Sequence, residues 1–114
     1  MSQTYPVRRH TRWPVQWLLL YGNDDFVANG TVLEITTNGW RVEGPMPVHP
    51  GMRLNIWVWP PEKPEGLHIG ATTVLWVKGY EFRLDVQDMN PIDHAWLMQF
   101  LDRALGWYLV PRVA

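Results

Sequence analysis

The sequence predicts a mainly β protein, a small antiparallel barrel of six or seven strands followed by one C-terminal helix. Three observations favour this fold. Short runs of alternating apolar and polar residues recur along most of the chain, separated by turns rich in Gly, Pro, Asn and Asp. A single stretch near the C-terminus has apolar residues at helical spacing instead. The chain has 114 residues, of which 46% are hydrophobic and 18% are charged, which suits one folded domain with a single core.

The alternation of side chains identifies the strands. In the first one, Val15, Trp17, Leu19 and Tyr21 share one face, and a turn rich in Asn, Asp and Gly follows. The proline-rich segment 60–66 suits neither a strand nor a helix and is predicted to be a loop. The predicted strands span residues 15–21, 31–37, 40–43, 52–59, 67–77 and 80–86.

The helix is predicted at about residues 91–105. Asn90 is a favourable N-cap, Pro91 suits the first helical position, and Asp93 places an acid in the first turn. Gly106 is suited to end the helix. Apolar residues at helical spacing form a broad face that must pack on the barrel: Ile92, Trp96, Leu97, Phe100, Leu101, Ala104 and Leu105.

The charge balance limits the classes of partner. Ten basic and eleven acidic residues give a net charge of −1, so bulk charge favours neither a nucleic acid polymer nor an anionic membrane. Residues 1–13 are predicted to form a flexible arm, and residues 14–114 the barrel with its helix. The first residues lack the apolar run of a signal peptide, and the longest apolar stretch, 18–21, is too short to span a bilayer. We therefore expect a cytoplasmic protein without membrane insertion.

The sequence contains no pattern typical of a catalytic or metal site. It has no cysteine, and its single serine, Ser2, lies in no nucleophile context. The histidines lie far apart, without the spacing of metal ligands; they are His10, His49, His68 and His94. We expect a binding protein rather than an enzyme, without a cofactor.

A cluster of arginines near the N-terminus is the first part of a candidate ligand site. Arg8, Arg9 and Arg12 lie within five residues of one another. The planar guanidinium group makes paired hydrogen bonds to phosphate, or to the O6 and N7 acceptors of guanine. Arg9 is either a further phosphate contact or a solvated side chain. The cluster therefore predicts a local anion site.

The second part lies on the second predicted strand. Alternation places Leu33 and Ile35 toward the core, and Glu34 and Thr36 together on the outer face. A carboxylate accepts hydrogen bonds from the N–H edge of guanine. Gly39 follows in the turn and allows a ligand to approach the backbone closely. The predicted ligand-binding residues are Arg8, Arg9, Arg12, Glu34, Thr36 and Gly39.

These two clusters resemble the motifs of the PilZ domain family. Arg8-x-x-x-Arg12 is similar to the RxxxR motif of the family, and Glu34-x-Thr36-x-x-Gly39 to its [D/N]xSxxG motif. Glu34 and Thr36 depart from that motif by a methylene and a methyl group, respectively. The similarity extends over roughly residues 8–105. It implies a six-stranded β-barrel that binds the bacterial second messenger cyclic di-GMP, with the arginines on the phosphates and guanine edges.

The resemblance implies a receptor or adaptor in second-messenger signalling that changes its surface for a downstream protein effector when cyclic di-GMP binds. Two alternatives remain open. One is a PilZ-like adaptor that does not bind cyclic di-GMP. The other is a glycan-binding β module that uses Trp57 and Trp59, which alternation places side by side on the outer face. Against this, the pair is also suited to pack with Trp96 under the helix. Trp40 is a candidate to stack on a bound guanine.

Overall fold

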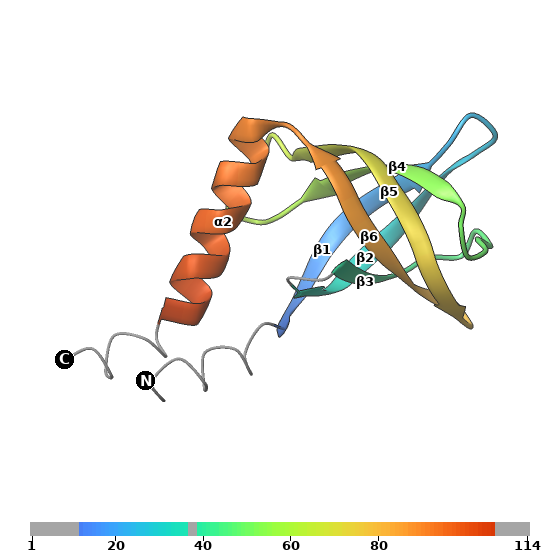
Figure 1. The fold of residues 1–114 in the computed structure, drawn as a ribbon, viewed down its shortest axis with the longest axis horizontal. Coiled ribbons are helices and arrows are strands. Elements are labelled where there is room, and N and C mark those ends of the chain that lie inside the picture. Colours follow the sequence, from blue (N-terminus) through green and yellow to red (C-terminus); the bar gives the residue numbers. More distant parts are fainter. Residues whose placement is uncertain (1–11, 37–38, 107–114) are drawn as a thin grey trace.

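The computed structural model describes residues 12–36 and 39–106, with side chains as far as Arg103. These residues form a closed barrel of six antiparallel strands with one C-terminal helix (Figure 1), which confirms the predicted fold class. The elements are β1 (Arg12–Gly22), β2 (Val27–Thr36), β3 (Gly39–Glu43), β4 (Arg53–Trp59), β5 (Leu67–Lys78), β6 (Glu81–Met89) and α2 (Pro91–Gly106).

The barrel consists of two three-stranded meanders that join along two seams. β1, β2 and β3 pair in sequence order, and so do β4, β5 and β6. β1 pairs with β4 along one seam, and β3 pairs with β6 along the other. The closed order is therefore β1-β2-β3-β6-β5-β4, which leaves no free edge among these strands.

Alternation along the strands fills the barrel interior as the sequence predicts. In β4, Leu54, Ile56 and Val58 are buried, and Trp57 is 43% exposed. The same rule applies along β1 and β6. The buried core consists of Trp17, Leu19, Tyr21, Val32, Ile35, Trp40, Val42, Leu54, Ile56, Val58, Ile69, Val74, Phe82, Leu84, Leu97 and Leu101.

Strand β2 departs from simple alternation. Its register against β3 shifts between Val32 and Glu34, which marks a β-bulge. Because of this extra residue, Val32 and Ile35 both belong to the core, and Leu33 is half-buried outside it. The predicted inward orientation of Ile35 is confirmed, and that of Leu33 is wrong.

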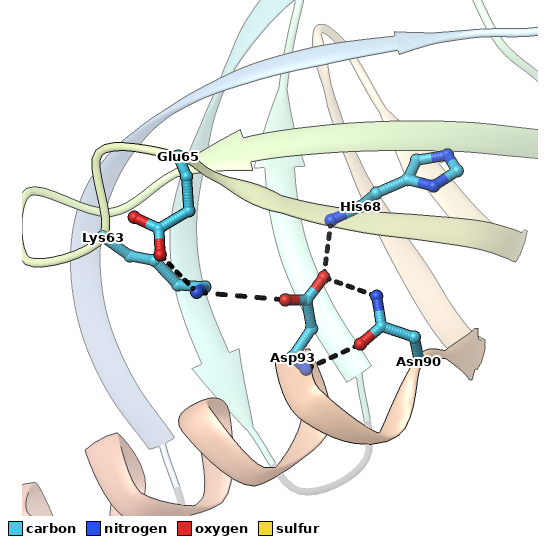
Figure 2. A network of polar contacts seen from close by, with 5 residues as sticks. All are labelled: Lys63, Glu65, His68, Asn90 and Asp93. Carbon is cyan, nitrogen blue, oxygen red and sulfur yellow. Dashed lines mark hydrogen bonds and ion pairs between the residues drawn. The ribbon is translucent and has the colours of Figure 1, made fainter.

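A polar network anchors the first turn of α2 (Figure 2). Asn90 caps the helix, because its Oδ1 accepts a hydrogen bond from the Asp93 N–H at 2.8 Å. Asp93 Oδ2 accepts hydrogen bonds from Asn90 Nδ2 at 3.0 Å and from the His68 N–H at 3.1 Å. Lys63 Nζ lies 4.0 Å from Asp93 Oδ1 and 3.0 Å from Glu65 Oε2. The network therefore ties the β4–β5 loop and β5 to the helix.

The helix packs on β1 through aromatic contacts. The ring centroids of Trp96 and Phe100 lie 6.3 and 5.3 Å from that of Trp17. The ring contacts of Trp57 and Trp59 are instead with each other and with a histidine of β5. The predicted packing of Trp57 and Trp59 with Trp96 is therefore wrong, because the helix covers another part of the barrel.

The ends of the elements add three facts. β1 begins at Arg12, so the predicted arm is wrong for Arg12 and Trp13, which are strand residues. The side chains of Ala104 and Leu105, expected on the apolar face of the helix, lie outside the described part of the chain. Within residues 12–36 and 39–106, no helix is long and apolar enough to cross a membrane.

Candidate ligand-binding site

Three strands bring the end of the arginine motif beside the second motif. Arg12, the first residue of β1, pairs directly with Thr36, the last residue of β2. Thr36 also pairs with Gly39, the first residue of β3. Residues directly opposed in antiparallel strands point to the same face, with Cα atoms about 4.5–5.5 Å apart. Arg12, Thr36 and Gly39 therefore form one row on the outer face, next to core residues such as Ile35 and Trp40.

The Thr36 hydroxyl is hydrogen-bonded to neighbouring strands of the barrel. Thr36 is only 7% exposed. Its Oγ1 donates a hydrogen bond to the Gly39 carbonyl at 2.7 Å and accepts one from Nη2 of Arg83, in β6, at 2.9 Å. Thr36 thus joins the end of β2 to the start of β3 and positions the Arg83 guanidinium on the outer face.

Glu34 lies on the same face in an ion pair. Its Oε1 is 3.7 Å from Nε of Arg41, its direct partner in β3. Arg41 Nη1 in turn donates to Glu81 Oε1 at 2.8 Å. The hydrogen bond to Glu81 raises the pKa of Arg41 above its ordinary value, and the charge of Glu34 adds to this shift. The Glu34 side chain, predicted to face a ligand, is 15% exposed, and its carboxylate shares Arg41 with Glu81.

Strand β6 lies close to the backbone of Gly39, at the place where a ligand was expected. Gly39 has a φ of +150°, which side chains rarely adopt. A methyl group at this position would lie 2.5 Å from the Leu84 carbonyl oxygen of β6. The sheet alone therefore requires glycine here, and the approach of a ligand to Gly39 stays a prediction.

Two arginines of this face are absent from the sequence-based prediction. Arg41 and Arg83 are direct partners across the β3–β6 seam. Each lies between two core residues of its own strand, so alternation in the sequence would have predicted that its side chain points outward. The sequence could not predict that the two arginines are paired, because alternation does not reveal which strands close the barrel. Together with Glu34 and Thr36 they form a polar patch across β2, β3 and β6.

Other predicted residues fall elsewhere. Arg8 and Arg9 lie outside the described residues, so Arg12 is the only predicted arginine that can be placed in the described part of the chain. Trp40 is 2% exposed, and its ring packs edge-on against Trp17 at 6.2 Å. The prediction that Trp40 stacks on a bound guanine is therefore wrong, because its ring lies inside the barrel.

A groove on the outer face crosses the row of paired residues next to Glu34 and Arg41. It has a volume of about 540 Å³, and none of the four residues of the polar patch lines it. Both polar groups and apolar side chains line it. Its lining includes Leu18, Asn29, Thr31, Glu43, Pro45 and Tyr80.

A separate aromatic face lies on β4 and β5. Trp57 stacks on His68, its direct partner in β5, with ring centroids 4.1 Å apart and planes inclined by 20°. Trp59 lies 6.4 Å from Trp57 at the same inclination. The exposed side chain of Leu18 in β1 is the direct partner of Trp59. Trp57 is the exposed ring of this face, and Trp59 and His68 are half-buried.

No protein family matches the sequence, and no characterised protein matches it either. Among the residues that the structure describes, no group of three or more His, Cys, Asp or Glu side chains is placed to hold a metal ion. The functional interpretation therefore depends on the geometry of the polar patch and of the aromatic face.

Proposed function

We propose that the protein is a receptor or adaptor for cyclic di-GMP. The observation that supports this function best is the β1–β2 register, which puts Arg12 of the arginine motif directly beside Thr36 of the second motif. A compact anion in front of Thr36 would meet the guanidinium of Arg12 on one side and that of Arg83 on the other.

In the proposed complex, Arg8 and Arg12 bind the phosphates and a guanine edge, where the rigid donor fork of arginine is suited to both. Glu34 accepts hydrogen bonds from the N–H edge of guanine. Guanine then replaces Arg41 as the partner of Glu34. Arg41 keeps its closer partner, Glu81, at 2.8 Å, so Arg41 retains a counterion. The Glu34 carboxylate exchanges its ion pair for hydrogen bonds from the guanine N–H groups.

The proposed output is a change of surface. A bound dinucleotide covers the polar patch with a rigid anionic group and orders the arginine-bearing segment around it. A partner protein that distinguishes the two surfaces then shifts its own equilibrium in response. The receptor would in this way act as an adaptor between the second messenger and a downstream effector.

Isothermal titration calorimetry with cyclic di-GMP tests the proposal, with GMP and cyclic di-AMP as controls. We expect micromolar or tighter binding that is selective for the guanine dinucleotide. Arg12→Ala should weaken binding by about tenfold or more with almost no change in thermal stability, since Arg12 is exposed. Arg53→Ala, at an exposed arginine of β4, is the matched control and should bind like the wild type.

Two outcomes would refute the proposed receptor function. One is the absence of heat with cyclic di-GMP up to hundreds of micromolar, which would favour an adaptor that works through protein contacts alone. The other is loss of the fold in Arg12→Ala, which would make Arg12 a structural residue.

Carbohydrate binding is a second candidate function, favoured by the aromatic face. Trp57 is 43% exposed, and its ring lies nearly parallel to those of Trp59 and His68. Exposed aromatic rings of this kind form platforms for the apolar faces of sugar rings. Quenching of tryptophan fluorescence by oligosaccharides that persists in Arg12→Ala and disappears in Trp57→Ala would establish this function. Equal quenching in both variants would exclude it.

A further inference from the structure

We propose that the ligand site continues across the β3–β6 seam, with Arg83 as a further ligand-binding arginine and Trp76 as the surface on which a guanine ring stacks. This inference rests on the proposed function and extends it to residues outside both sequence motifs. It is carried by one row of directly paired residues, Glu34 in β2, Arg41 in β3, Arg83 in β6 and Trp76 in β5.

The row has a common face and a defined length. Each residue in it is the Cα partner of the next, so all the side chains leave the outer side of the barrel. Neighbouring strands lie about 4.8 Å apart, so the row spans roughly 14 Å from β2 to β5. A row of this length has room for a base at one end and phosphates near its centre, which favours a dinucleotide over a mononucleotide.

Arg83 is the arginine of the row whose guanidinium is not paired with a carboxylate among the described residues. Its Nη2 donates to Thr36 Oγ1, and among the described residues no carboxylate lies within 4.0 Å of its guanidinium. Arg41, in contrast, is paired with both Glu34 and Glu81. Arg83 can therefore bind an anion without displacing a carboxylate. Because its hydrogen bond to Thr36 points it toward β1 and β2, it shares that anion with Arg12.

Trp76 is turned outward by a second bulge. The register of β5 against β6 shifts between Val74 and Trp76, so Leu75 and Trp76 both lie outside the core. Trp76 is 37% exposed, whereas the core tryptophans Trp17 and Trp40 are 3% and 2% exposed. Within the described residues, no other aromatic ring or cation stacks on Trp76. Trp76 is therefore accessible from solvent and unoccupied by another ring.

The two residues together select the class of ligand. A nucleobase of any kind stacks on an indole, because every base has a π-face. The Arg83 guanidinium is held at Thr36, on the side of β6 away from Trp76, so it is placed to meet a phosphate and not the stacked base. Because Trp76 and Arg83 are direct partners, a nucleotide whose base stacks on Trp76 can extend across β6 toward that guanidinium. Glu34, at the other end of the row, accepts hydrogen bonds from the N–H edge of guanine, so the row is suited to a guanine dinucleotide.

Calorimetry on matched variants tests the inference. Arg83→Gln and Trp76→Leu should each weaken cyclic di-GMP binding by about tenfold or more. Trp76→Phe keeps an aromatic face and should retain most of the affinity. Arg53→Gln should bind like the wild type, because this exposed arginine lies on β4, outside the row. Thermal unfolding of each variant checks that the fold is intact.

Nuclear magnetic resonance gives a readout that a structural role would not change. The indole N–H resonance of Trp76 is assigned by its loss in Trp76→Phe, and it should move during titration with cyclic di-GMP. The corresponding resonance of Trp57, on β4, should stay in place. Suppose that the wild type binds cyclic di-GMP, but Arg83→Gln and Trp76→Leu bind with unchanged affinity or the Trp76 resonance does not move. This result would overturn the further inference and leave the receptor function standing.

Failure of the proposed function is a separate outcome. If the wild type does not bind cyclic di-GMP, titration with GMP to millimolar concentration tests the row by itself. Movement of the Trp76 resonance that Arg83→Gln abolishes would retain the inference for a guanine mononucleotide. No movement would overturn the inference together with the receptor function.

Discussion

Replacing Gly39 with alanine is expected to lower the free energy of unfolding by about 2–6 kcal/mol. The backbone at φ +150° is strained for any residue with a side chain, at a cost of about 1–3 kcal/mol. The new methyl group would also lie 2.5 Å from the Leu84 carbonyl oxygen. Moving that strand away costs a further ~1–3 kcal/mol, and the total is a large part of the ~5–15 kcal/mol that stabilises a typical domain.

Two other glycines separate these contributions. Gly51 has a φ of +88°, but no heavy atom lies within 4 Å of an added methyl group, so Gly51→Ala measures backbone strain alone. At Gly70 the φ is not positive and the nearest atom, Asp88 Oδ2, is 3.9 Å away. Gly70→Ala should therefore change stability by less than about 1 kcal/mol.

Urea unfolding followed by tryptophan fluorescence is the appropriate assay, with equal m-values as the condition for comparison. We expect the urea midpoint of unfolding to be highest for Gly70→Ala, lower for Gly51→Ala and lowest for Gly39→Ala. In thermal unfolding, Gly39→Ala should lower Tm by at least about 8 °C. If Gly39→Ala were no less stable than Gly51→Ala, the contact with Leu84 would contribute nothing and the argument would be refuted. Ligand binding by a Gly39 variant can be interpreted only after this measurement.

Two further predictions concern other parts of the barrel. Asp93→Ala should lower the free energy of unfolding by about 1–3 kcal/mol, because the His68 N–H loses its acceptor and Lys63 loses the more buried of its two carboxylate partners. A double-mutant cycle with Lys63→Met measures the ion pair, and zero coupling would contradict it. Burial raises the pKa of Tyr21, against the lowering effect of its hydrogen bond with the Met46 backbone. The folded state thus favours the neutral phenol, and this stability is fully present below the unfolded pKa of about 10 and is lost as pH rises through the higher folded value. Tyr21→Phe should reduce the alkaline loss, which unfolding at a series of pH values would detect; an unchanged pH profile would contradict this assignment.

Much of the fold was predictable from local chemistry. Alternation gave the core faces of β1 and β4, and Asn90, Pro91 and Asp93 marked the start of the helix. These features depend on residues that are close together in the sequence. For that reason they appear without knowledge of the pairing between strands.

The candidate site was less predictable because it depends on bulges and on pairing between distant strands. A bulge inserts one residue into a pattern of period two, so alternation assigned Leu33 to the core. The bulge before Trp76 has the same effect, and it puts two consecutive residues on the outside. The pairing of Arg41 with Arg83 joins residues of different meanders, which no local pattern encodes.

The two seams have a consequence for how the barrel assembles. Pairs within a meander are close in sequence, whereas the seams join Leu18 to Trp59 and Arg41 to Arg83. Because non-local contacts must overcome the entropy of loop closure, we expect the meanders to form first and the seams last. Until then β1, β3, β4 and β6 present open edges to other chains. A ligand held by Glu34 in β2 and Arg83 in β6 would bridge one seam, slow its opening, and protect the amide hydrogens of β3 and β6 from exchange.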